Sequence, residues 1–204
     1  MKPGKTRKEN RSEKTRKRIL ASADQVFYQR GLRKVTVEEL CAGMAISKRT
    51  FYKHFPDRDA LVEAIIANRM AEVGPLIIEN LNSRRPVPEI LERHFDLLVN
   101  KVFTRVSVQM LADLQVMLPE VWERIETVRG LALQALAEMI RKGQKRGAIR
   151  SDLDPEVLGK IIQAVVPTIA NPAFLMEQGL SLEQIAMTMK RILLYGLLKP
   201  GKEA

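Results

Sequence analysis

Residues 36–55, with the sequence TVEELCAGMAISKRTFYKHF, predict two short helices joined by a tight turn. Thr36 is suited to cap the first helix, because a threonine followed three residues later by Glu39 is the pattern of a capping box. This helix is expected over residues 37–42. Gly43 is then expected to take the positive φ of a sharp turn.

The second helix is expected to begin after Ser47, a good N-cap residue, and to run to about His54. Apolar positions in the stretch are predicted to face inward, against Phe27 and Leu61 of the flanking segments; they are Leu40, Ile46, Phe51 and Phe55. The outward positions are rich in hydrogen-bond donors. Two short capped helices around a tight turn are typical of a helix-turn-helix, whose second helix enters the major groove of DNA.

The outward side chains suit the chemistry of a DNA surface. Lys48 and Arg49 can donate to guanine O6 and N7, and Thr50 can meet a phosphate or a thymine methyl group. Residues at helix starts are natural phosphate contacts, because free N–H groups attract anions there. The predicted DNA-binding residues are Thr36, Ser47, Lys48, Arg49, Thr50, Tyr52, Lys53, His54 and Arg58.

The charge distribution supports this interpretation. Residues 1–60 hold 16 Lys and Arg against 7 Asp and Glu, or +9, whereas residues 61–204 hold 18 against 17, or +1. A basic segment joined to a nearly neutral one is typical of a polyanion-binding module on a neutral partner domain. The alternative is a solvated basic tail that aids solubility, and charge alone does not separate the two.

Outside the motif the chain reads as helix, and strand-like alternation is absent. Residues 1–10 are expected to form a flexible basic arm, Ser12 to cap the first helix and Gly31 to end it. A fourth helix is expected from about residue 58, and Pro75 is expected to kink or end it. Later helices are expected at about 89–102, 106–117, 120–146, 156–169 and 182–198.

The motif resembles the signature of the tetracycline-repressor (TetR) family. That signature is a short capped helix, A-G-x-x-x-S, a helix ending F-Y-x-H-F, an acidic residue and a leucine; the matching residues are Ala42, Gly43, Ser47, Phe51, Tyr52, His54, Phe55, Asp59 and Leu61. The match covers about residues 12–62. The chain departs at Arg49, where a small or flexible residue is usual, and at Cys41, where alanine is usual. Arg49 should alter base preference.

The resemblance implies a homodimer that binds palindromic double-stranded operator DNA and is released by a small molecule. It implies a transcriptional regulator, most often a repressor, without an enzymatic activity or a cofactor. The predicted fold is all-α. After the arm, a three-helix helix-turn-helix DNA-binding domain is expected at residues 11–57, and a larger helical ligand-binding and dimerisation domain at 58–204.

The last two predicted helices have broad apolar faces that can pair with their symmetry mates in a four-helix bundle. The predicted dimer-interface residues are Leu158, Ile161, Ile162, Val165, Ile169, Ile185, Met189, Ile192, Leu193 and Gly196. The alternative is that these faces complete the core of the monomer.

The middle helices are expected to hold any ligand, because a few polar groups interrupt their apolar positions. The predicted ligand-binding residues are His94, Phe95, Leu98, Phe103, Gln109, Met110, Asp113, Leu114, Met117, Trp122, Ile125 and Phe174. Residues of these types are more often simply core. Neither the charge of a ligand nor its existence follows from the sequence.

Other functional classes find less support. Two histidines 40 residues apart and one cysteine, Cys41, form no catalytic constellation, and no metal motif or phosphate loop is present. RNA binding would favour exposed aromatic residues. A non-specific architectural DNA-binding protein and a transcriptional activator stay open as alternatives. A single cysteine, and the absence of a signal-peptide core or membrane-length apolar run, predict a cytoplasmic protein without a membrane partner.

Overall fold

The computed structural model describes residues 7–198, and this part of the chain is helical without β-strands, as the sequence predicted. It divides into two compact units, Met1–Asn68 and Arg69–Ala204, called the head and the body below. The predicted domain boundary at residue 57/58 puts all of the fourth helix in the second domain. The two compact units instead divide that helix after Asn68.

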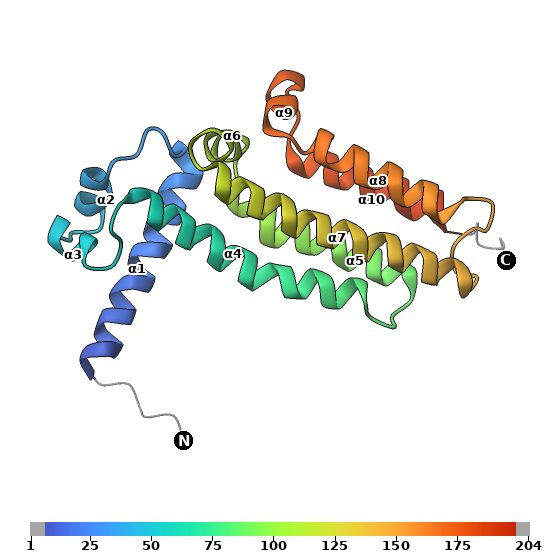
Figure 1. Cartoon of the computed structure of the whole chain (residues 1–204), viewed down its shortest axis with the longest axis horizontal. Coiled ribbons are helices and arrows are strands. Elements are labelled where there is room, and N and C mark those ends of the chain that lie inside the picture. The colour runs from blue at the N-terminus through green and yellow to red at the C-terminus, as the bar shows by residue number, and fades with distance from the viewer. Residues whose placement is uncertain (1–6, 199–204) are drawn as a thin grey trace. The chain divides into compact units, whose positions relative to one another are not determined.

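The head contains α1 (Arg7–Arg30), α2 (Val37–Gly43), α3 (Lys48–Tyr52) and the first part of α4 (Arg58–Leu81) (Figure 1). Five of the residues predicted to form its core are buried: Phe27, Leu40, Phe51, Phe55 and Leu61. Ile46 is only half-buried. The burial of three phenylalanines from α1, α3 and the turn after α3 fixes the short recognition helix to its support.

Helix α1 begins earlier than predicted. Residues 7–10 belong to the helix, so the flexible arm was wrong for them, and Ser12 lies inside the helix instead of capping it. The rest of the predicted arm, residues 1–6, lies outside the described residues. Gly31 follows the last residue of α1 with a φ of 74°, which is the predicted left-handed ending.

The turn between α2 and α3 is built differently from the prediction. Gly43 is the last residue of α2, and the positive φ belongs to Ala45, at 51°. Ala45 is the one non-glycine residue with positive φ among residues 7–198. A left-handed alanine is strained because its Cβ crowds the next carbonyl, so the motif keeps some strain at this turn.

Pro75 was predicted to kink or end the helix; α4 runs on past Pro75 to Leu81, so the second of these alternatives was wrong. A proline inside a helix leaves one carbonyl without its usual donor. Packing compensates on the other side of the helix, where Val73, Ile77 and Leu81 are all buried in the core of the body.

The body continues with α5 (Val87–Leu97), η1 (Leu98–Val102), η2 (Phe103–Arg105), α6 (Val108–Met117), α7 (Pro119–Lys145), α8 (Pro155–Ile169), α9 (Pro172–Gln178) and α10 (Leu182–Leu197). Helix α7 packs along α8, α5 packs along α10, and α6 contacts both α7 and α9. Caps at Ser107, Asp154, Asn171 and Ser181 start four of these helices. Helix α9 was not predicted.

The predicted helix at residues 89–102 changes character at Leu98. From there to Val102 the backbone is π-helical, and the Phe103 N–H donates to the carbonyl of Leu98, five residues back. A 3₁₀ turn follows. Such π-turns are frequent at functional positions, because they persist only where other contacts hold them.

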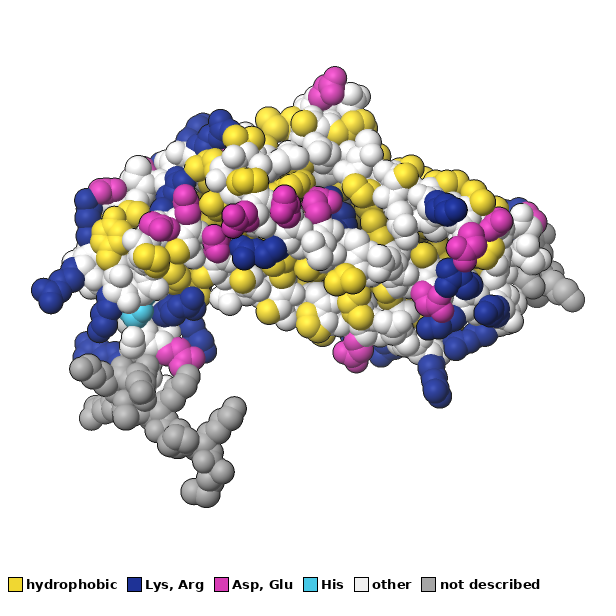
Figure 2. Space-filling view, in the orientation of Figure 1, with side chains coloured by type: hydrophobic (Ala, Val, Ile, Leu, Met, Phe, Trp, Pro, Cys, Tyr) yellow, Lys and Arg dark blue, Asp and Glu magenta, His cyan; other side chains and the backbone are white. Residues whose placement is uncertain are grey.

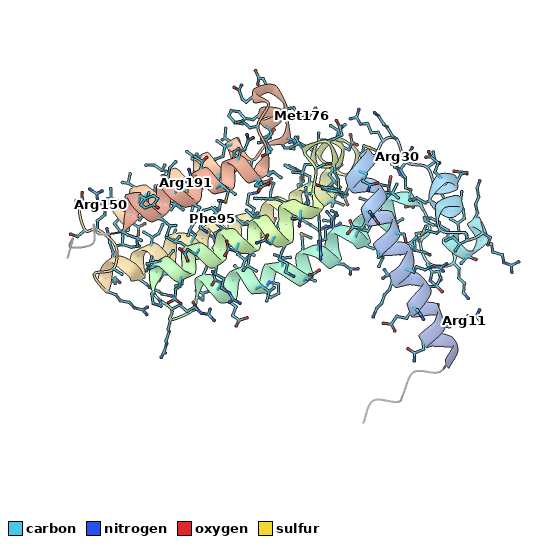
Figure 3. All side chains as sticks on the ribbon, turned by 180° about the vertical axis from the view of Figure 1, so that it is seen from behind. Arg11, Arg30, Phe95, Arg150, Met176 and Arg191 are labelled. Carbon is cyan, nitrogen blue, oxygen red and sulfur yellow. The ribbon has the colours of Figure 1, made fainter. Side chains whose placement is uncertain are left out.

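A large apolar cluster in the body joins α4, α5, α7, α8 and α10, and Phe95 lies in it (Figure 3). Within residues 7–198 no single helix is long and apolar enough to cross a membrane. Helices α8 and α9 meet that test only when taken together, across a bend of 68°.

Candidate nucleic-acid interface

Local hydrogen bonds define the start of α2. The Thr36 hydroxyl accepts from the Glu39 N–H at 3.2 Å, and the Glu39 carboxylate accepts from the Thr36 N–H at 2.9 Å. Arg30 at the end of α1 donates to the same carboxylate at 2.8 Å. Together these contacts lower the pKa of Glu39 to about 2, with the Arg30 hydrogen bond as the largest cause. The predicted capping box is therefore confirmed and is tied to α1.

The start of α3 is fixed in a similar way. The Ser47 side chain accepts from the Thr50 N–H at 3.1 Å, and the two hydroxyls lie 2.9 Å apart. Phe51 lies wholly in the core, while Tyr52 beside it is 49% exposed. One face of a five-residue helix is thus buried, and the other is free to meet a ligand.

The structure brings most of the predicted DNA-binding residues together on that free face. Lys48, Arg49, Tyr52 and Lys53 are exposed, and Thr50 and His54 are half-buried. Figure 2 shows Lys and Arg side chains gathered over the head, around α1 to α3. The arrangement offers many donors over a short helix, which is what phosphates and guanine edges require.

His54 is kept in its neutral form at neutral pH. Burial lowers its pKa, and the positive charges of Lys53 and Arg16 lower it further. The guanidinium carbon of Arg16 lies 5.0 Å from the centre of the Phe55 ring. This places an exposed arginine of α1 beside the end of α3, a neighbour of the interface that the sequence pattern did not single out.

Arg58 does not lie with the others. Its guanidinium donates to the carbonyls of Leu32 and Val35 at 3.0 and 3.4 Å, and it pairs with Asp59 at 3.0 Å. The side chain is only 22% exposed. The structure therefore gives Arg58 a role in joining α4 to the connection between α1 and α2, which sequence reasoning missed because those carbonyls lie more than 20 residues away.

An acidic residue also lies at this surface. The carboxylate of Glu38 on α2 pairs with Nζ of Lys48, the first residue of α3. The hydrogen bond from Lys48 is the largest cause of the lowered pKa of Glu38, and it raises the pKa of Lys48 in turn. The sequence pattern singled out the lysine but not its partner.

The predicted dimer residues fall into three groups. Ile161, Val165 and Ile192 are exposed, and five more are half-buried: Leu158, Ile169, Ile185, Met189 and Gly196. Ile162 and Leu193 are 3% and 4% exposed and pack in the core of the body. For these two residues the alternative interpretation, completion of the monomer core, fits the structure.

The predicted ligand residues lie on α5 to α7 and α9, and half-burial is the commonest state among them. Five are buried: His94, Phe95, Met110, Asp113 and Leu114; Gln109 is exposed; the half-buried ones are Leu98, Phe103, Met117, Trp122, Ile125 and Phe174. Asp113 accepts a hydrogen bond from Gln109 at 2.9 Å. Arg129, which was not predicted, stacks over Trp122 at 5.8 Å.

His94 is unusual within this group. Burial lowers its pKa to about 4, so the ring is neutral at neutral pH. Its Nδ1 is buried without a hydrogen-bond partner among the described residues. A buried polar atom without a partner costs free energy and calls for a physical explanation. Residues 7–198 contain no group of three or more His, Cys, Asp or Glu able to hold a metal ion.

Comparison with known proteins agrees with this geometry. Residues 19–65 match the family model of bacterial regulatory proteins of the tetR family. The chain is 25% identical over 178 residues to the transcriptional repressor BepR of Brucella suis, covering 82% of this chain and 84% of that protein. It is 24% identical over 148 residues to the transcriptional regulator UidR of Escherichia coli, covering 72% and 76%.

A solved structure of a transcriptional regulator from Saccharomonospora viridis, in complex with choline, has the same fold. It superimposes with a TM-score of 0.70 at 18% identity, over 92% of this chain and all of that one. The family match lies on the helices that form the candidate DNA-binding surface, and the likeness to BepR and UidR extends well beyond them. Residues 19–65 belong to the tetR family of bacterial regulatory proteins, and the chain is a DNA-binding transcriptional regulator.

Proposed function

We propose that the chain is a homodimeric repressor that binds a palindromic operator through α3 and is released by a small molecule bound in the body. The observation that carries the DNA-binding part is the surface of α3: a helix fixed by Phe51, capped by Ser47 and exposing Lys48, Arg49 and Lys53. A dimer seated on a promoter blocks polymerase without a further contact surface.

Two apolar stripes support the proposed dimer. On α8, Val157 and Ile161 are 53% and 52% exposed, and Val165 follows four residues later at 39%. On α10, Ile192 is 56% exposed and Tyr195 is 84% exposed. Residues three or four apart share one face of a helix, so the residues of each stripe lie on one face.

These stripes shift the expected interface on α10. Of the predicted α10 residues, Ile192 is exposed, whereas Ile185, Met189 and Gly196 are half-buried and Leu193 is buried. The exposed face also holds Met187, Thr188, Arg191 and Tyr195. Figure 2 shows hydrophobic side chains over α8, and Figure 3 places Arg191 on α10. Large exposed apolar side chains are typical of an interface between subunits.

The DNA-binding proposal is tested by capturing genomic fragments on the purified protein. Binding to the best fragment and to random DNA of equal length is then measured over a range of salt. A palindrome bound at least about a thousandfold better than random DNA supports the proposal. Equal binding to all fragments, removed by salt, would instead indicate an architectural protein.

The dimer proposal is tested by sedimentation of the full chain. Ile161→Asp places a charge in the α8 stripe, and we expect it to yield a monomer with weakened operator binding. Val116→Asp is the matched control, because Val116 on α6 is 66% exposed but lies outside both stripes. A dimer that survives Ile161→Asp and the corresponding Ile192→Asp would contradict the proposed interface.

The effector proposal is supported by the unpartnered Nδ1 of His94 and the π-helical turn that follows it. A neutral imidazole suits a small molecule with a hydroxyl or amide group. Choline, which the S. viridis regulator binds, is the first probe. We expect an effector to raise the melting temperature and to release operator DNA, and His94→Phe to abolish both effects. If no hydroxyl-bearing compound does so, the effector part fails while the DNA-binding part stands.

A further inference from the structure

Two neighbouring carboxylates in the first turn of α2 are used differently. Glu39 closes the capping box and binds Arg30. Glu38 instead pairs with Nζ of Lys48, the first residue of α3. These are the only acidic residues in the stretch 36–55, which otherwise offers cations and neutral donors. A negative charge on a surface that meets phosphates opposes binding, so its position calls for an explanation.

Stability of the fold does not supply that explanation. The side chains of Lys48 and Glu38 are 55% and 59% exposed. Ion pairs between exposed side chains contribute little to folding, because water and salt screen them. The helix-capping work in this turn is already done by Thr36 and Glu39. What the pair does is fix the direction of a flexible lysine at the N-terminal end of the recognition helix.

We infer that Glu38 is a positioning residue that sets DNA specificity through Lys48. On random DNA, binding depends on cations free to meet phosphates, and the carboxylate withholds one of them. At the operator, a guanine offers O6 and N7 to the same ammonium. Because an ammonium has three donors, Lys48 can keep one bond to Glu38 and give two to the base. The Glu38 carboxylate therefore lowers the affinity for random DNA more than the affinity for the operator.

This inference rests on the proposed operator binding, and its test is a comparison of Glu38→Gln with the unchanged chain. Fluorescence anisotropy measures affinity for operator and random duplexes of equal length between 50 and 200 mM salt. The logarithm of the affinity for random DNA falls linearly with the logarithm of the salt concentration, and we expect Glu38→Gln to steepen this slope by about 0.9, the value of one phosphate contact. The increase in affinity for random DNA should then be about 3.5-fold larger at 50 mM than at 200 mM salt. Operator affinity should change less, so the ratio of operator to random affinity should fall about threefold or more.

Glu79→Gln is the matched control. This substitution removes the same charge from an exposed residue of α4 that lies far along the chain from α3. Equal effects of the two variants would overturn the inference, because only net charge would then matter. Glu38→Asp should restore part of the ratio, and Lys48→Gln should remove the effect of Glu38→Gln. If the unchanged chain shows no operator preference, the proposed function fails, whereas the slope on random DNA still tests the Glu38–Lys48 pair.

Discussion

Replacing Arg58 by methionine separates two roles for this residue, a phosphate contact and a structural tie. The structure gives its guanidinium one good hydrogen bond, to the Leu32 carbonyl at 3.0 Å, and a longer one, to Val35 at 3.4 Å. A hydrogen bond from a charged group contributes about 1.5–3 kcal/mol, and the longer bond and the half-exposed Asp59 pair contribute less. We expect Arg58→Met to lower the free energy of unfolding by about 2–4 kcal/mol.

Urea unfolding and salt-dependent DNA binding together decide between the roles. If Arg58 is a structural tie, stability falls and the salt slope of the remaining folded protein is unchanged. Lys53→Met is the contrasting variant, because Lys53 is exposed; it should leave stability unchanged and reduce the slope by about 0.9. Unchanged stability together with a smaller slope for Arg58→Met would refute the structural role and restore the phosphate contact predicted from the sequence.

Further predictions concern stability. Because His94 has a folded pKa of about 4, below its ordinary value of 6.5, the folded state binds fewer protons than the unfolded state between these values, and stability is lost as pH falls from 6.5 to 4. The full loss in the free energy of unfolding is about 3 kcal/mol by linkage, and it should be absent in His94→Phe. Urea titrations at pH 7, 5.5 and 4.5 follow this loss. Gly143→Ala should destabilise by about 1–3 kcal/mol, because its Cβ would lie 2.8 Å from Ile149. A Cβ at Gly130 on the same helix would meet nothing within 4 Å, so Gly130→Ala should stabilise by about 0.5–1 kcal/mol. If the two substitutions shift the melting temperature in the same direction, this reasoning is wrong. Ala45→Gly should remove the strain of a left-handed alanine and raise the melting temperature without changing the preferred bases. A lower melting temperature would show that the turn is not strained.

Features set by neighbours along the chain were predictable from the sequence. The caps at Thr36 and Ser47 and the left-handed glycines at 31 and 147 follow from contacts within about four residues. The inward face of the motif followed as well, since Phe51 and Phe55 lie one helical turn apart. These local rules were enough to place α2 and α3 and hence the DNA-facing side chains.

Features set by distant contacts were not predictable. The carbonyls that Arg58 binds belong to another element, and so does the carboxylate that pairs with Lys48. Helical spacing also gives α10 two apolar faces. Only the packed structure shows that Leu193 belongs to the core and that Ile192 and Tyr195 are exposed. The short helix α9 was not predicted, because seven residues are too few to establish a helical period.

The π-helical turn at Leu98–Val102 amounts to a helix with one surplus residue. In an α-helix the Phe103 N–H would bond to the carbonyl of Val99; here it reaches one residue further back, to Leu98. Since each residue turns an α-helix by about 100°, the surplus rotates the side chains of the following 3₁₀ turn, Phe103–Arg105, by about that angle. A single-codon deletion in this turn would restore the α register and redirect Phe103. In the proposed effector site, regulators that differ by one residue here would present a different wall to the small molecule, while the preceding helix α5 would stay unchanged.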